Sequence, residues 1–234
     1  MERIGTVAMV WRYPVKSMAG ERLTSAPLTF QGIPGDREYA FVKADSRSSF
    51  PWLTGRDLPS LLHYHASYRA DEKSPVLVRT PAGQAFAADS DELSRELASA
   101  SGKQIHLLRD YRGSFDVAPV AVMALSTARH IAASTGTADD PLRYRMTVYI
   151  DTGSDEPFVE NTWVGRELRL GGTARVGVTE PDKRCVMITL DHSTSPGSPA
   201  ILKAVGQLNN AAAGAYAVVT ASGELSEGDE VTIV

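Results

Sequence analysis

The chain contains little cysteine and no long hydrophobic run, and both shortages limit what it can be. One cysteine, Cys185, stands among 234 residues. A single thiol excludes an intrachain disulfide framework and any zinc or iron–sulfur site built from several cysteines. No stretch of about 18 apolar residues occurs, so we expect no membrane span. No early basic segment precedes a long apolar one, so we expect no signal peptide and a cytoplasmic location.

The chain also lacks a strong excess of charge of either sign. Its 24 Lys and Arg residues against 28 Asp and Glu residues give a formal net charge of −4. A nucleic-acid-binding protein usually carries a basic excess that neutralises phosphates, so we expect no nucleic-acid partner. Hydrophobic residues make up 43% of the chain and charged residues 22%, which is typical of a globular protein with a substantial core.

Several catalytic motifs are missing as well. The chain contains no GxSxG nucleophile elbow, no GxxxxGK[ST] phosphate loop and no HExxH zinc motif. His63 and His65 lie two residues apart in an expected strand, where they would share a face and could supply half of a metal site. No third ligand accompanies them, so a packed or solvated strand face is the preferred interpretation.

What the chain does contain is a series of short alternating segments with Gly and Pro between them. In residues 6–13, TVAMVWRY, Val7 and Met9 occupy alternate positions and would face the same side of a strand. Residues 37–44 and the C-terminal residues 214–234 continue this strand pattern. Many short strands separated by glycine and proline predict a barrel or a sandwich.

Three helices are expected between these strands. Their expected N-caps are Asp89, Ser126 and Ser198. Gly102 and Gly136 would end the first two helices, because glycine readily adopts the left-handed conformation of a helix C-terminus. The third helix would bury Ile201, Val205 and Leu208.

The segment around the single cysteine, EPDKRCVMITLD, places the cations Lys183 and Arg184 directly before Cys185. RCVMITL has the composition of a strand, in which alternation sends Arg184 to the face opposite Cys185. On these residues alone, a buried structural cysteine is the simplest interpretation, because a free cysteine packs like a small hydrophobic residue.

Six short motifs follow one another along nearly the whole chain. They are RYPVKS (12–17), GDREY (35–39), LTGRDLP (53–59), PLRYRMTV (141–148), FVENTW (158–163) and DKRC (182–185). In this order they resemble the MOSC family, and in particular the bacterial relatives of the mitochondrial amidoxime reducing component. The resemblance implies a mainly β (α+β) fold, with two joined β-barrel-like parts and a few short helices, similar to the pyruvate-kinase barrel. It also implies a MOSC N-terminal β-barrel-like domain over residues 1–88 and a MOSC domain over residues 89–234.

The resemblance further implies a molybdenum cofactor, a pterin that carries molybdenum on a dithiolene and ends in a phosphate. A thiolate suits such a metal as an extra ligand, and an anionic phosphate requires cations, hydroxyls and backbone N–H groups. By position, Cys185 would be the molybdenum ligand and the catalytic residue. Besides Cys185, the expected cofactor contacts are Lys16, Ser17, Arg37, Thr54, Arg56, Ser126, Arg143, Arg145, Thr147 and Arg184. Arg143 and Arg145 would share one face of a strand.

Two segments depart from the family pattern. RxRPN becomes RYRMT, so Met146 and Thr147 replace a proline and an asparagine, and LDHSTSPG replaces an acidic residue followed by a TG pair after the cysteine. The resemblance implies a molybdenum-dependent oxidoreductase that removes oxygen from small N-hydroxylated compounds. A separate protein would supply the electrons, because no cysteine-rich redox domain follows Val234.

The altered segments leave two other functions open. The protein could be a carrier, either of sulfur as a persulfide on Cys185 or of the cofactor without turnover of its own. Alternatively, it could be a scaffold that has lost the cofactor and buries Cys185. Loss of metal and activity in Cys185→Ala is expected of the enzyme alone, and releasable sulfur on Cys185 is expected of the sulfur carrier alone.

Overall fold

The structure is a computed structural model that describes residues 2–69 and 76–234. It divides the chain into two units. The barrel unit comprises Met1–Trp11, Arg22–Pro34 and Asp116–Val234, and the small-sheet unit comprises Arg12–Glu21 and Gly35–Phe115. Each unit is therefore assembled from segments that are distant in the sequence. The expected domain boundary between residues 88 and 89 stays a prediction.

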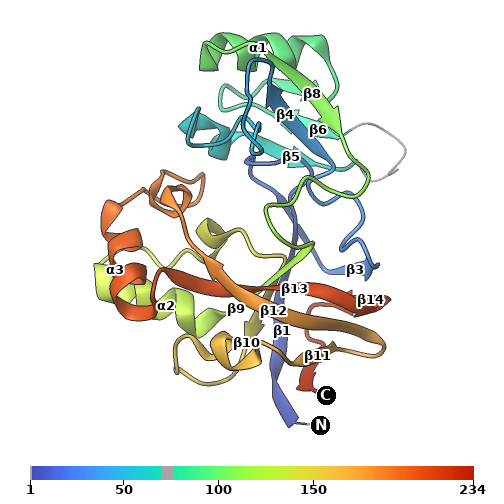
Figure 1. Cartoon of the computed structure of the whole chain (residues 1–234), viewed down its shortest axis with the longest axis vertical. Helices are drawn as coiled ribbons and strands as arrows, with labels where there is room; N and C mark the ends of the chain where they lie inside the picture. Colours follow the sequence, from blue (N-terminus) through green and yellow to red (C-terminus); the bar gives the residue numbers. More distant parts are fainter. Residues whose placement is uncertain (1, 70–75) are drawn as a thin grey trace. The chain divides into compact units, whose positions relative to one another are not determined.

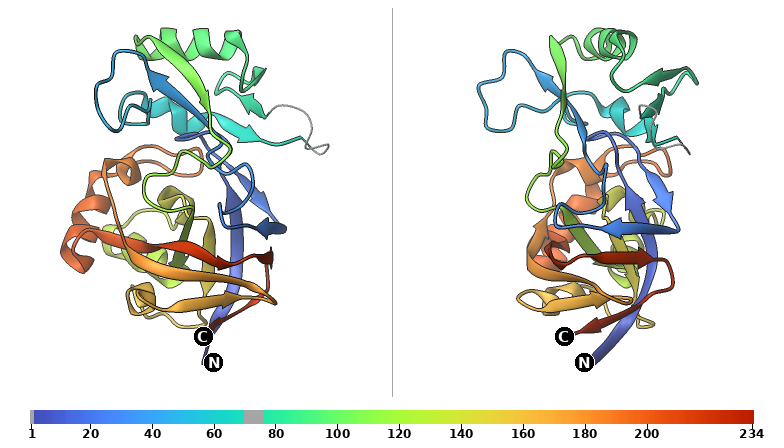
Figure 2. Two further views of the ribbon diagram at one scale, coloured as in Figure 1. Left: turned by 45° about the vertical axis from the view of Figure 1, so that its right-hand side comes forward. Right: turned by 90° about the vertical axis from the view of Figure 1, so that its right-hand side faces the viewer.

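Seven strands close into the barrel of the first unit (Figure 1). Their bounds are β1 Glu2–Arg12, β9 Val120–Ala124, β10 Val148–Asp151, β11 Glu167–Leu170, β12 Ala174–Lys183, β13 Ala212–Ala221 and β15 Glu230–Ile233. Their order is β10-β9-β13-β12-β11-β15-β1, and β1 pairs back onto β10. β9 and β10 pair in parallel, whereas β1 and β15 pair antiparallel and bring the two terminal strands side by side (Figure 2).

Alternating apolar side chains fill the interior of the barrel. β11 buries Leu168 and Leu170, and β12 buries Val176 and Val178, all within one apolar cluster. Such period-2 alternation turns one face of each strand inward, and a barrel of this size is filled by those side chains. The mainly β fold class predicted from the sequence is confirmed, with the helices α1, α2 and α3 in the described part of the chain.

β1 departs from the regular alternation expected for it. Its pairing with β10 shifts register between Val7 and Met9, which is the mark of a β-bulge. Val7 and Val10 face the barrel core, whereas Met9 packs against the apolar cluster that includes Ile201. The prediction that Val7 and Met9 share a face is therefore wrong, because the extra residue of the bulge reverses the faces of the strand.

Two helices, α2 (Leu125–Thr135) and α3 (Pro199–Asn209), pack against each other beside the barrel (Figure 1). Ser198 caps α3 as predicted, since its side chain accepts the backbone N–H of Ala200. Leu208, however, is 42% exposed, because it lies in the last turn, where the helix leaves the apolar cluster.

The predicted start of α2 needs a correction. Its N-cap is Ala124, and Ser126 lies inside the first turn, because β9 runs directly into the helix without an intervening loop. Gly136 ends the helix in the left-handed conformation, with φ of 65°, as predicted. The remaining elements of this unit are β2 (Glu21–Leu23), which pairs with β1, the pair β3 (Ser25–Leu28) and β14 (Gly223–Ser226), and the 3-10 helices η2 (Pro141–Tyr144), η3 (Val159–Trp163) and η4 (Val186–Thr189).

The small-sheet unit contains two small sheets and one α-helix in its described residues. Its elements are β4 (Tyr39–Lys43) paired with β8 (Ile105–Arg109), the sheet of β5 (His65–Ser67), β6 (Leu77–Arg79) and β7 (Ala85–Ala87), the 3-10 helix η1 (Pro59–His63) and α1 (Asp91–Ser101). The N-cap of α1 is Ser90 rather than Asp89, because the Ser90 hydroxyl accepts the N–H of Leu93 at 3.3 Å. Gly102 ends the helix as predicted.

The histidine pair does not form the predicted strand face. His63 ends η1 and His65 begins β5, so the turn between them breaks the alternation on which the prediction depended. Among the described residues, no group of three or more His, Cys, Asp or Glu side chains is arranged to hold a metal ion. Within the same residues, no helix is long and apolar enough to cross a membrane.

Candidate functional site

Cys185 lies at the junction between β12 and η4. β12 ends at Lys183, and Cys185 has extended backbone angles, φ −123° and ψ −178°, immediately before η4. The strand predicted for RCVMITL is wrong, because a 3-10 turn forms there, in which the N–H of Ile188 donates to the Cys185 carbonyl at 3.3 Å. The thiol is free and exposed, so the interpretation of Cys185 as a buried structural residue is also wrong.

Arg184 is held beside Cys185 through both ends of its guanidinium. One Nη donates to the carboxylate of Asp182, and the other donates to the carbonyl of Tyr144 at 2.9 Å. The backbone N–H of Arg184 donates to the carbonyl of Ala211 at 2.8 Å. Its Nε is buried without a hydrogen-bond partner among the described residues. A positive charge in a defined orientation therefore precedes the thiol.

Arg143 and Arg145 do not lie in a strand, and the prediction that they share a strand face is wrong. Arg143 belongs to η2 and Arg145 ends it, because the chain turns here and β10 begins only at Val148. Arg143 is 2% exposed and donates to the carbonyl of Ile188, in the segment after Cys185, at 2.8 Å. Burial lowers the pKa of Arg143.

The positive charge of these arginines acts on a buried histidine. His192 is 8% exposed, and its Nε2 lies 3.3 Å from the carbonyl oxygen of Met187. Burial, and then the charge of Arg145, lower the pKa of His192 to about 4. Positive charge from Arg145 therefore acts on the segment that follows Cys185, and positive charge favours an anionic ligand.

Ser126 and Thr147 make their hydrogen bonds within the barrel framework. The hydroxyl of Ser126 donates to the carbonyl of Glu156 at 2.7 Å. Thr147 is 1% exposed, and its hydroxyl accepts the N–H of Ala121 at 3.2 Å, while Met146 is completely buried. The residues that replace the proline and the asparagine therefore contribute to packing and strand pairing. The cofactor contacts expected of Ser126 and Thr147 stay predictions.

In the small-sheet unit, Lys16 and Arg37 both contact the backbone of Ser114. Lys16 Nζ donates to the Ser114 carbonyl at 2.6 Å, and the Ser114 N–H donates to the Arg37 carbonyl at 2.8 Å. The Arg37 guanidinium pairs with the carboxylate of Asp36 and lies 4.5 Å from the ring centroid of Tyr13. The backbone of Ser114 thus contacts the ammonium of Lys16 and the main chain of Arg37, two residues that are separated in the sequence.

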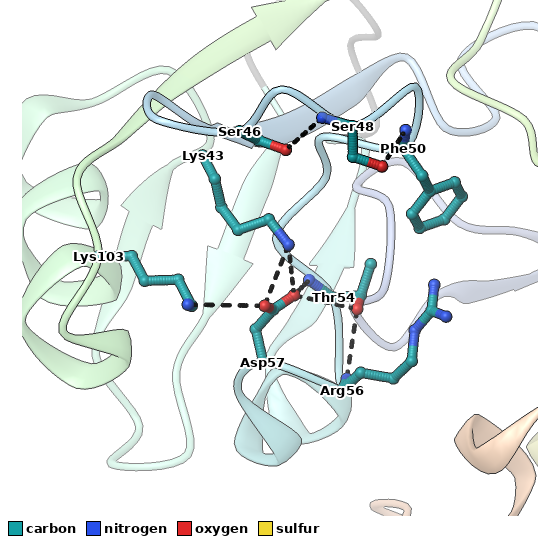
Figure 3. Close-up of polar contacts among 8 residues, drawn as sticks. All are labelled: Lys43, Ser46, Ser48, Phe50, Thr54, Arg56, Asp57 and Lys103. Carbon is teal, nitrogen blue, oxygen red and sulfur yellow. Dashed lines mark hydrogen bonds and ion pairs between the residues drawn. The ribbon is translucent and has the colours of Figure 1, made fainter.

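Phe50 lies beside Arg56 of the LTGR segment (Figure 3) and also contacts Lys16. Its ring centroid lies 5.4 Å from Lys16 Nζ and 4.9 Å from the Arg56 guanidinium carbon. The backbone N–H of Arg56 donates to the hydroxyl of Thr54 at 3.3 Å. Lys16, Thr54 and Arg56 therefore lie in one connected group of side chains within this unit.

Asp57 organises the same segment (Figure 3). Its carboxylate accepts the backbone N–H of Thr54 at 3.1 Å and pairs with Lys43 at 3.1 Å and Lys103 at 3.8 Å. Burial acts to raise the pKa of Asp57, but the hydrogen bonds from Lys43 and Thr54 lower it below its usual range. The charges of the two lysines are therefore partly balanced, whereas Arg56 packs on an aromatic ring.

Three of the sequence-predicted residues have left-handed backbone conformations. Ser17, Arg37 and Arg145 have φ values of 66°, 51° and 58°. Residues other than glycine rarely adopt such values, and the strain concentrates at functional sites. Phe158, Asn210 and Ala211 also have positive φ values, so the roles of Ser17, Arg37 and Arg145 stay predictions.

Sequence reasoning missed the residues that contact these side chains or the segment that follows Cys185. They are Asp140, Asp182, His192 and Ser195 in the barrel unit, and Phe50 and Asp57 in the small-sheet unit. Asp140 could have been recognised as a cap, because its carboxylate accepts the N–H of Leu142 at 3.1 Å just after Pro141. Ser195 had no local signal, since its partner Arg143 is 52 positions away.

Two family descriptions match the chain. Residues 4–112 match the MOSC N-terminal beta barrel domain, and residues 109–232 match the MOSC domain. The chain belongs to the MOSC family. Cys185 and its surrounding arginines lie in the part matched by the MOSC domain, and Lys16 lies in the part matched by the N-terminal domain.

Among solved structures, one shares the fold over almost the whole chain. The YuaD protein from Bacillus subtilis is similar over 97% of this chain and 93% of its own, with a TM-score of 0.53 and 12% sequence identity. YiiM from Geobacillus stearothermophilus and YiiM from Escherichia coli each align with 50% of this chain and 54% of their own. Their TM-scores are 0.40 and 0.36, at 16% and 14% identity. Curated proteins give no match.

The residues around Cys185 fit the molybdenum cofactor with which MOSC domains are associated. An exposed thiol can supply a soft ligand to the metal. Arg145 supplies positive charge that acts on His192 and can attract an anionic group. Arg184, whose guanidinium pairs with Asp182, directly precedes Cys185 in the sequence. The donor set therefore has both the sulfur and the cations that such a group requires.

Proposed function

We propose that this MOSC protein is a molybdenum-cofactor-dependent reductase of small N-hydroxylated compounds. The observation that carries the proposal is the exposed thiol of Cys185 at the end of β12, directly after Arg184. An exposed thiol is accessible to an incoming metal, to which it can supply a soft ligand. The positive field of Arg145 at the following segment supports the binding of an anionic cofactor there.

In this proposal the chain's own residues bind and orient. Cys185 would ligate the metal, and Arg145 and Arg184 would hold the anionic cofactor in place. When bound, the cofactor supplies the two-electron redox chemistry. Cleavage of the substrate N–O bond consumes two electrons from a separate electron-donor protein and two protons, and releases water. The roles expected of Lys16, Ser17, Arg37, Thr54 and Arg56, and the cytoplasmic location, stay predictions.

The molybdenum content of the purified protein tests the proposal first. Wild-type protein and Cys185→Ala would be purified from a host that makes the cofactor, and each assayed for reduction of an amidoxime with a reduced viologen as electron donor. We expect near-stoichiometric molybdenum and turnover in the wild type, and loss of both in the variant. Metal-free wild-type protein from a host whose other molybdenum enzymes are loaded would contradict the proposal. Full turnover in Cys185→Ala would show that the ligand is misassigned.

A carrier function is the second candidate, and the RYRMT segment favours it. Met146 is completely buried and the Thr147 hydroxyl is bonded to a backbone N–H, so neither side chain presents a free polar group to a cofactor. A sulfur carrier would take a sulfur atom from a persulfide donor onto the Cys185 thiolate, with release of the donor thiolate. Intact-mass measurement should then show the mass of one added sulfur, removed by reductant. A thiol that gains no such adduct would exclude the sulfur carrier.

A further inference from the structure

Arg143 binds residues 188–196 from inside the barrel unit. We call these residues the anchored loop. Its side chain is buried, with 2% of the residue exposed. Its two Nη atoms donate to the carbonyls of Ile188 at 2.8 Å, Leu190 at 3.4 Å and Pro196 at 2.9 Å, and to the hydroxyl of Ser195 at 2.5 Å. The acceptors span both ends of the loop, so one guanidinium closes it.

Asp140 completes the attachment from η2. Its Oδ2 accepts the hydroxyls of Thr194 at 2.6 Å and Ser195 at 2.5 Å, and its Oδ1 accepts the N–H of Leu142 at 3.1 Å. Ser195 therefore bridges the two buried charges, because it accepts from Arg143 and donates to Asp140. Both Nη atoms of the cation and both oxygens of the anion thus obtain hydrogen bonds that offset part of their desolvation. Arg143 Nε is buried without a partner among the described residues.

The attachment reaches Cys185 through two hydrogen bonds. The carbonyl of Ile188 accepts from Arg143, and the N–H of Ile188 donates to the carbonyl of Cys185 at 3.3 Å. We infer that Arg143 is a positioning residue, which fixes the anchored loop and through it the backbone of Cys185. A planar guanidinium can address several acceptors at defined angles, whereas the single ammonium of a lysine cannot.

This inference rests on the proposed function only for the metal that Cys185 would bind. The anchor consists of residues of the chain alone, so it can be tested on cofactor-free protein. The backbone N–H of His192 donates to Ser195 at 2.9 Å, and that of Ser195 donates to His192 at 3.2 Å. Hydrogen exchange of these two amides therefore reports opening of the anchored loop.

Arg143→Lys keeps the charge but removes the fork geometry. We expect the two amides to exchange about tenfold faster than in the wild type, because one hydrogen bond to a charged group changes a local equilibrium by about that factor. Leu168→Ala is the control, since it removes a completely buried side chain of the barrel core and leaves the anchor intact. Its exchange at these amides should follow the wild type under native conditions.

The single cysteine supplies a second, spectroscopic readout. A nitroxide label on Cys185 modifies one site, because the chain has no other cysteine. Its electron paramagnetic resonance spectrum should show a more mobile label in Arg143→Lys and an unchanged one in Leu168→Ala. Wild-type exchange and label mobility in Arg143→Lys would overturn the inference, because charge alone would then suffice.

A third variant keeps the test decisive if Arg143→Lys does not fold. Ser195→Ala removes the bridging hydroxyl and should accelerate hydrogen exchange of the same two amides severalfold. Unchanged exchange in this variant would equally overturn the inference.

The proposed function and the positioning role of Arg143 can fail independently of each other. An absence of molybdenum in the wild type leaves the exchange result standing, and unchanged exchange leaves Cys185 standing as the proposed ligand.

Discussion

His192 should make the protein lose stability as the pH falls. Burial and the positive charges of Arg145 and Arg143 lower the pKa of this imidazole from 6.5 to about 4, while Asp140 acts in the opposite direction. Between these two values the unfolded chain binds a proton at His192 and the folded protein does not. The stabilisation is therefore complete above about pH 6.5 and is lost as the pH falls towards the folded pKa.

The difference between the unfolded and folded pKa values of His192 determines how much stability is lost. A gap of about 2.5 at roughly 1.4 kcal/mol per pKa unit gives about 3 kcal/mol in full. At about pH 5 the unfolded imidazole is almost fully protonated and the folded one is almost neutral, so about 2 kcal/mol of this is lost. The effect is a large fraction of the stability of an ordinary domain.

His192→Gln removes the titration and keeps an N–H that can donate to the carbonyl of Met187. The free energy of unfolding of both proteins would be measured in urea at about pH 7.5 and about pH 5. Between these pH values the wild type should lose about 2 kcal/mol more stability than the variant. His106→Gln, which removes an exposed imidazole from β8, is the matched control. An equal pH dependence in wild type and His192→Gln, or an imidazole that titrates near 6.5 by NMR, would refute the reasoning.

Two further substitutions test side-chain hydrogen bonds, one in each unit. Thr127→Val should lower the free energy of unfolding by about 2 kcal/mol, because the hydroxyl donates to the buried carboxylate of Glu160 at 2.8 Å and accepts a backbone N–H at 2.7 Å. In the same urea experiment Thr162→Val, an exposed control, should cost less than about 0.5 kcal/mol, and equal costs would contradict the role of the Thr127 hydroxyl. Asp57→Asn should cost about 1 kcal/mol near neutral pH, since it loses two lysine partners. The cost should disappear at a pH low enough to protonate the wild-type carboxylate, and a cost that persists there would show that the charge is not responsible.

The fold was predictable where its signals are local. Alternating residues bounded by glycine and proline predicted a mainly β chain, and Ser198, Gly102 and Gly136 marked three helix ends correctly. Caps and C-terminal glycines act through hydrogen bonds and backbone angles within one turn, so a sequence window contains them. The bulge between Val7 and Met9 was not predictable, because it depends on the pairing of β1 with a strand far along the chain.

The candidate site was predictable only as a list of residues. The resemblance named Lys16, Arg37 and Cys185, but no pattern showed that Lys16 contacts the carbonyl of Ser114, 98 positions later. Nor did alternation reveal the exposure of Cys185, since RCVMITL has the apolar composition of a strand. Whether such a segment becomes a strand or a 3-10 turn depends on its partners, and here Arg143 supplies the hydrogen bonds that a strand neighbour would otherwise supply.

The 3-10 helix η2 places the two arginines of RYR, Arg143 and Arg145, in different environments. A strand would have placed Arg143 and Arg145 on one face, with equal access to a ligand. In η2, Arg143 instead enters the interior and binds the anchored loop, whereas Arg145 ends the 3-10 helix in a left-handed conformation and remains only partly buried. A partly exposed cation can contact an anionic ligand. A buried cation that donates to four acceptors, as Arg143 does, would first have to break those hydrogen bonds. The motif therefore places one arginine in the interior, bonded to the anchored loop, and the other at the partly exposed end of η2.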